Sequence, residues 1–181
     1  MTTALPVDFP ARAERTIWAG AMPPRELRNQ KRQPKRLTAQ PVFKPLKRNR
    51  LPKPFKTMGG ARLFATDLIE VSSSHQLIFV WRDGPILTDR AFYGWLLKKV
   101  SDSSLFPLLE MHWHPSHKGL HIKTPCRTEI DYTNRQLPGA PELGMRTVLR
   151  YDPRSESDRL ALIGRFCEAA GIELGAEGAL W

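Results

Sequence analysis

Residues 62–81 read RLFATDLIEVSSSHQLIFVW, and this stretch decides the fold class. Its two halves, 62–71 and 76–81, are rich in aromatic and β-branched residues, a composition that is typical of β-strands. The serines between them, Ser72 to Ser74, are a turn signal, so the two halves are predicted to form a hairpin. The sequence Asp83-Gly84-Pro85 then ends the second strand.

Three further strands are predicted downstream of this hairpin. Residues 105–114 and 120–124 flank a turn at 116–119, and residues 145–151 read MRTVLRY. These segments predict a second antiparallel pair and one additional strand.

Two helices are predicted between and after these strands. Thr88 has the character of an N-cap for a helix through Val100, with Phe92 and Trp95 on its buried face. Ser155 and the acidic residue three positions later form a capping box for the last helix, which Gly171 ends. The order β-β-α-β-β-β-α predicts an α+β fold, with about five mostly antiparallel strands and two helices on one face.

The positive charge of the chain is concentrated in its first third. Residues 1–60 hold 14 Lys and Arg against three acidic residues, whereas residues 61–181 hold 14 against 15. Nine prolines in residues 1–60 oppose regular structure, and little apolar surface is available there to offset the entropy of ordering. We therefore expect residues 1–60 to be an extended or disordered basic arm, and residues 61–181 to be the α+β domain.

An extended basic segment is suited to a polyanion, because each cation can reach a separate phosphate and release its counterions. Phe43 and Phe55 lie among these cations and are candidates for stacking on unpaired bases. The predicted phosphate-binding residues are Lys31, Arg32, Lys35, Arg36, Lys44, Lys47, Arg48, Arg50, Lys53 and Lys56 in the arm, with Lys118, Lys123 and Arg127 in the domain.

Four of the five histidines lie in residues 110–123, EMHWHPSHKGLHIK. Alternation along the two strands places Glu110, His112, His114, His121 and Lys123 on one face of the sheet, which we expect to be open to solvent. Met111, Trp113 and Ile122 are expected on the other face, toward the core. A four-residue turn at 116–119 would pair His114 with His121. Imidazole and carboxylate groups suit a divalent metal, so Glu110, His112, His114 and His121 are candidate ligands. The same region is alternatively a platform for nucleic acid, with Trp113 or Tyr132 available for stacking, or a solvated polar surface without further role.

The element His112-Trp113-His114 resembles the His-hydrophobic-His element of the HUH endonucleases. The resemblance covers these three residues. It implies a metal-dependent nuclease or nickase that acts on single-stranded DNA through a tyrosine, and Tyr132 would be that tyrosine.

Three functions follow from these patterns. The first is a non-catalytic nucleic-acid-binding subunit of a larger assembly, with RNA or single-stranded DNA and a partner protein as its ligands. The second is the HUH-like nuclease, and the third is an inhibitor or adaptor that invades an acidic or nucleic-acid groove on its target. No cofactor is expected under the first function, and a divalent metal is expected under the second.

Compartment and redox state are also constrained by the sequence. No run of 18 apolar residues is present, so an intracellular location is expected, in the cytoplasm or with a nucleoid or nucleus. The two cysteines, Cys126 and Cys167, form no CxxC pair, which excludes a cysteine zinc module and predicts free thiols.

Overall fold

The computed structural model describes residues 29–51, 55, 58, 61–101, 104–115, 119–123 and 151–175. Its strands, 3-10 helices and α-helix are β1 (Arg36–Leu37), β2 (Lys44–Pro45), η2 (Lys47–Asn49), β3 (Arg62–Ala65), β4 (Ile69–Ser72), β5 (His75–Asp83), η3 (Leu87–Asp89), β6 (Ala91–Ser101), β7 (Ser104–His114), β8 (Gly119–Lys123), α2 (Glu156–Ala170) and β9 (Glu173–Leu174). Residues 29–32 are also helical.

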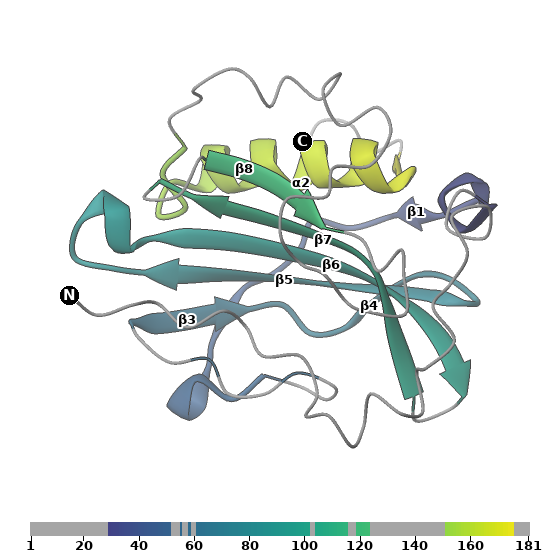
Figure 1. Cartoon of the computed structure of the whole chain (residues 1–181), viewed down its shortest axis with the longest axis horizontal. Helices are drawn as coiled ribbons and strands as arrows, with labels where there is room; N and C mark the ends of the chain where they lie inside the picture. The colour runs from purple at the N-terminus through teal and green to yellow at the C-terminus, as the bar shows by residue number, and fades with distance from the viewer. Residues whose placement is uncertain are drawn as a thin grey trace.

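A seven-stranded antiparallel sheet forms the body of the molecule (Figure 1). The order of its strands is β2-β3-β5-β6-β7-β8, and β4 pairs with β5 outside this path. The parallel pair β1–β9 forms a separate small sheet. The predicted α+β class and antiparallel pairing are confirmed, as is the hairpin across the serine turn, formed by β4 and β5. Its first strand, predicted at 62–71, is divided into β3 and β4, and both pair with β5. The predicted strand at 145–151 lies outside the described residues, except for its last residue.

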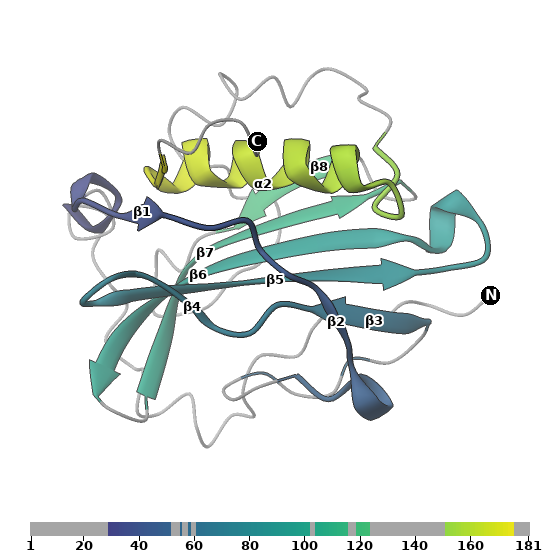
Figure 2. The ribbon, with the colours of Figure 1, turned by 180° about the vertical axis from the view of Figure 1, so that it is seen from behind.

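The last helix is confirmed together with both of its caps. The Ser155 hydroxyl accepts the backbone N–H of Asp158 at 3.4 Å, and Gly171 ends α2 in the left-handed conformation with φ 64°. The buried side of α2 packs on one face of the sheet, which we call the helix face (Figure 2). Gly94 on β6 makes this packing close, because a Cβ atom there would lie 2.8 Å from the Phe166 ring.

The helix predicted at 88–100 is wrong, because residues 91–101 form strand β6. Every residue from Ala91 to Leu97 is buried, so both sides of this strand face apolar surroundings. A run that is apolar throughout does not distinguish a helix from a doubly covered strand. Phe92 belongs to the core under α2, and Trp95 belongs to the core on the opposite face.

The opposite face of the sheet is covered by the segment that precedes β3. Leu51, Phe55 and Met58 pack against the side chains of that face, and the Phe55 and Trp95 rings lie 5.0 Å apart. Phe55 is 8% exposed, so the expectation that it stacks on bases is wrong.

Residues 29–51, which we call the strap, lie on the domain rather than apart from it. The strap runs from β1 across the helix face to β2 at the edge of the sheet (Figure 2). Backbone hydrogen bonds fix both of its ends, from Gly175 N–H to the Leu37 carbonyl at 2.8 Å and from Leu46 N–H to the Leu63 carbonyl at 2.9 Å. Leu37 is fully buried in the core under α2.

The expected boundary at residue 60 is therefore corrected for the described part of the arm. The boundary at residue 60 follows from the small apolar surface that the arm itself carries. An extended chain can instead bury alternate residues against a surface that the domain already provides, and prolines are compatible with this extended backbone. Residues 1–28 lie outside the described residues.

Two buried polar side chains hold the first turn of the strap. Lys35 is 2% exposed, and its ammonium group donates to the carbonyls of Gln30, Lys31 and Gln33 at 2.7, 3.0 and 2.8 Å. Burial, followed by the charge of Lys31, lowers the pKa of Lys35 to about 8.

His75, at the start of β5, is fully buried and connects this turn to the sheet. Its Nε2 donates to the Gln30 amide oxygen at 2.9 Å, and its Nδ1 accepts from the hydroxyls of Ser72 and Ser74 at 2.9 and 3.0 Å. Because an amide oxygen only accepts hydrogen bonds, this network selects the neutral imidazole with its proton on Nε2.

Cys167, on α2, is a buried free thiol, and burial raises its pKa to about 12. Within the described ranges, no helix combines the length and apolar character needed to cross a membrane.

Candidate nucleic-acid interface

The strap carries eight Lys and Arg and no acidic residue. Six of these cations are exposed and make no ion pair with any described residue; they are Lys31, Arg32, Arg36, Lys47, Arg48 and Arg50. The other two have partners. Lys44 forms an ion pair with Asp67 at 2.5 Å, and Lys35 is buried as described above. The expectation that Lys35 binds phosphate is corrected, because its three donor positions are used by carbonyl groups inside the fold.

Three of the exposed cations, Lys47, Arg48 and Arg50, directly follow β2, the strand that pairs with β3. Lys44 pairs with Ala65 and Pro45 with Phe64 in antiparallel register. The hydrogen bond between Leu46 and Leu63 continues this register by one position. Lys47 then begins η2, directly after this paired segment, and Arg62, the first residue of β3, is itself exposed.

We call this region the basic corner, and it consists of Lys47, Arg48, Arg50, Arg62 and Phe64. Its backbone is strained at Arg48, which has φ 54° and ψ 28°. Of the described residues other than glycine, only Arg48 has positive φ. A side chain with a Cβ atom costs roughly 1 kcal/mol in this conformation, which glycine or asparagine adopts more readily.

A row of alternating cations and rings extends from the basic corner across the helix face. The Arg62 guanidinium lies over the Phe64 ring, 5.0 Å from its centroid. The Phe64 and Trp81 rings are stacked, with centroids 4.4 Å apart and an interplanar angle of 7°. Arg159 from α2 then lies over both Trp81 and Phe43, at 5.0 and 5.6 Å. The row joins the strap, β3, β5 and α2, so it holds the strap against the sheet as well as ending at the basic corner.

The acidic side chains nearest to the corner already have partners. Asp67 pairs with Lys44, and Asp83, which lies opposite Arg62 in the β3–β5 register, accepts from Arg154 at 2.5 and 2.9 Å. Both charges are thus balanced by residues outside the corner. The corner itself retains four positive charges without a partner carboxylate among the described residues.

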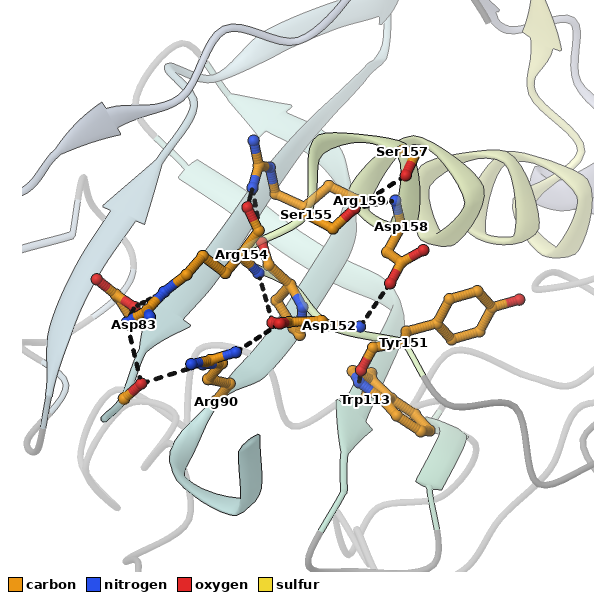
Figure 3. Close-up of polar contacts among 12 residues, drawn as sticks. Asp83, Arg90, Trp113, Tyr151, Asp152, Arg154, Ser155, Ser157, Asp158 and Arg159 are labelled. Atoms are coloured by element: carbon orange, nitrogen blue, oxygen red, sulfur yellow. Dashed lines mark hydrogen bonds and ion pairs between the residues drawn. The ribbon is translucent and has the colours of Figure 1, made fainter. Parts of the chain in front are cut away.

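The segment before α2 forms a separate, internally balanced network (Figure 3). Arg90 binds Asp152 at 2.5 Å, and the backbone N–H of Asp152 donates to Asp158 at 2.7 Å. Burial by itself raises the pKa of Asp152, but hydrogen bonds from Arg154 and Arg90, together with their charges, outweigh burial and lower it. The indole N–H of Trp113 donates to the Tyr151 carbonyl at 3.2 Å. These contacts dock α2 on the ends of β5 and β7, and they leave little unbalanced charge at the helix N-terminus.

The histidine strands are confirmed as a hairpin, with a register that differs from the predicted one by two residues. His112 pairs with His121, and His114 pairs with Gly119. The shift is even, so the same residues of β7 share a face, and Met111 and Trp113 are buried toward α2 as expected. Trp113 is 5% exposed, which removes it as a stacking candidate.

The expectation that the histidine face is open is wrong for its central residues. Glu110 and His112 are each 4% exposed, and the His112 Nε2 lies 2.7 Å from a Glu110 oxygen. The His112 ring makes edge contacts with Tyr93 and Trp95 at 5.1 and 6.0 Å. This face is the one covered by the segment before β3, which the sequence did not predict. Burial raises the pKa of Tyr93 in the same cluster.

A metal site at these residues stays a prediction. In the part of the chain that the structure describes, no three His, Cys, Asp or Glu side chains come together as a metal-binding group. The Nε2 atom of His112 lies against the Glu110 carboxylate. The His121 and Lys123 side chains lie outside the described part of the structure, as do Lys53, Lys56, Lys118, Arg127 and Tyr132.

Sequence reasoning missed Arg62, Phe64 and Arg159. The alternation of Arg62 and Phe64 on one side of β3 was a usable signal. Their proximity to the strap has no signal in the local sequence, because it depends on the pairing of β2 with β3.

The comparisons with known proteins supply no family for this chain. It matches no protein-family model, no curated protein and no solved structure.

Proposed function

We propose that this protein is a nucleic-acid-binding accessory subunit of a larger nucleoprotein assembly. The observation that carries the proposal is the set of six exposed cations without an ion pair to any described residue, on a strap that is itself fixed to the domain. A free basic arm would lose conformational entropy on binding. A strap that is already ordered presents its charges at a smaller cost.

The charges favour a phosphate backbone as the ligand. Four guanidinium or ammonium groups lie on two adjacent segments at the basic corner, and arginine in particular recognises phosphate through paired donors. Neighbouring Asp67 and Asp83 do not oppose a polyanion strongly, because each has a cationic partner. Binding of this kind gains free energy from counterion release and is sequence-tolerant.

Charge removal at the corner tests the proposal. Arg48→Gln with Arg50→Gln removes two positive charges from the corner. Lys98→Gln with Lys99→Gln removes the same number from β6 and serves as the matched control. Affinity for a fluorescent oligonucleotide is measured by anisotropy across a series of salt concentrations.

The corner variant is expected to bind more weakly, and the slope of log affinity against log salt should fall in magnitude by about 1.4 to 1.8, for two lost phosphate contacts. The control should retain the wild-type slope. Equal weakening in both variants would show that net charge alone drives association, and the assignment of the interface to the corner would be rejected. Stable capture of a protein from nuclease-treated extract, without oligonucleotide binding, would favour the adaptor function instead.

A further inference from the structure

The basic corner contains an aromatic ring whose plane is fixed before any ligand arrives. Phe64 is half-buried, and Trp81 lies parallel against it at 4.4 Å. Trp81 is 7% exposed and is held in turn by Arg159. The phenyl ring is therefore rigid, which reduces the entropy that is lost when another group stacks on it.

The second face of the Phe64 ring lies under a displaceable cation. The indole occupies one face, and the Arg62 guanidinium lies over the other at 5.0 Å. Arg62 is exposed and forms no ion pair with a described residue, because the carboxylate opposite it, Asp83, is engaged by Arg154. Among the described residues, this guanidinium contacts the Phe64 ring. It can move outward and cover a flat ligand that enters above the ring.

We propose that Phe64 and Arg62 form a stacking site for one unpaired base, enclosed between the phenyl ring and the guanidinium plane. The inference rests on the proposed function, and it makes the ligand a single-stranded nucleic acid. Rings and guanidinium planes both stack on bases, and a base that is paired in a duplex does not expose its face for such a contact. Lys47, Arg48 and Arg50 then hold the phosphates on either side of that base.

The test separates base contacts from phosphate contacts with three probes of equal length. These are an oligothymidine single strand, an abasic single strand with the same phosphates, and a duplex. The wild-type chain should bind the oligothymidine about tenfold more tightly than the abasic strand, which is the contribution of one stacked base. The Phe64→Leu variant should lose this difference while its affinity for the abasic strand and its salt slope stay at the wild-type values.

Phe64→Tyr keeps the ring and should retain the wild-type preference. This variant controls for a local change in packing, and thermal melting of each variant reports its stability. Equal affinity of the wild-type chain for the oligothymidine and abasic strands would overturn the stacking site and leave the proposed function intact. The absence of salt-dependent binding to all three probes would overturn both.

Discussion

Replacement of Gly94 by alanine tests the packing of α2 on the sheet. A Cβ atom at this position would lie 2.8 and 3.1 Å from two carbons of the Phe166 ring, and 3.1 Å from the Phe79 ring. Both rings are fully buried and meet edge to face at 5.1 Å, so neither can move without disturbing the core.

Two opposing effects set the magnitude. Inserting a methyl group into a closely packed core costs about 1 to 3 kcal/mol. Loss of the glycine's freedom in the unfolded chain returns about 0.5 to 1 kcal/mol. The net expectation is a decrease of about 1 to 2 kcal/mol in the free energy of unfolding.

Gly164 on α2 provides the matched control. A Cβ atom there meets nothing within 4 Å, and the residue lies in the interior of the helix. Gly164→Ala should stabilise the protein by about 0.5 to 1 kcal/mol, because alanine has the higher helix propensity. Urea unfolding followed by circular dichroism measures both variants. If Gly94→Ala proved as stable as the wild-type chain, the described seating of α2 on β6 would be refuted.

Two further predictions concern how the strap is held. Leu37→Ala should lower the free energy of unfolding by about 2 to 5 kcal/mol, because Leu37 is fully buried in the core. Val42→Ala, at a position that is 69% exposed, should change it by less than about 0.5 kcal/mol. Equal urea midpoints for the two variants would contradict the packing of the strap on the domain. Burial, with the positive charges of Lys35 and Lys98, lowers the pKa of His75 to about 4, so between pH 6.5 and pH 4 the unfolded chain binds a proton that the folded chain does not. The free energy of unfolding should therefore fall by up to about 3 kcal/mol as the pH decreases through this window. The His75→Gln variant should be less stable at pH 7, but its stability should lose this part of the pH dependence. An unchanged pH dependence of stability in the variant would contradict the buried neutral imidazole.

The features that the sequence predicted correctly are those with local signals. The serine turn of the first hairpin needs only neighbouring residues, and the same is true of the Ser155 and Gly171 caps of α2. Alternation along β7 also assigned Met111 and Trp113 to the core although the turn was misjudged, because a shift of two residues keeps the same face.

The features that it did not predict depend on distant parts of the chain. Residues 91–97 are apolar throughout, and only the cover on both faces of the sheet decides that they form a strand. His112 likewise contacts Tyr93 and Trp95 in a cluster that Leu51, Phe55 and Met58 complete from some fifty positions earlier in the sequence. The strap carries too few apolar residues to fold alone, and its order depends on anchoring surfaces in the domain. For the candidate site, charge composition predicted the cations of the strap. It did not predict that the strap lies beside Arg62 and Phe64, because that placement depends on the β2–β3 pairing.

The decisive measurement for the basic corner is the salt dependence with which the wild-type chain binds an oligothymidine strand. The four cations of the basic corner, each with one phosphate, predict a slope of about −3 when log affinity is plotted against log salt concentration. A slope near zero would mean that these charges do not meet a phosphate backbone, and the account of the corner as a nucleic-acid interface would be contradicted.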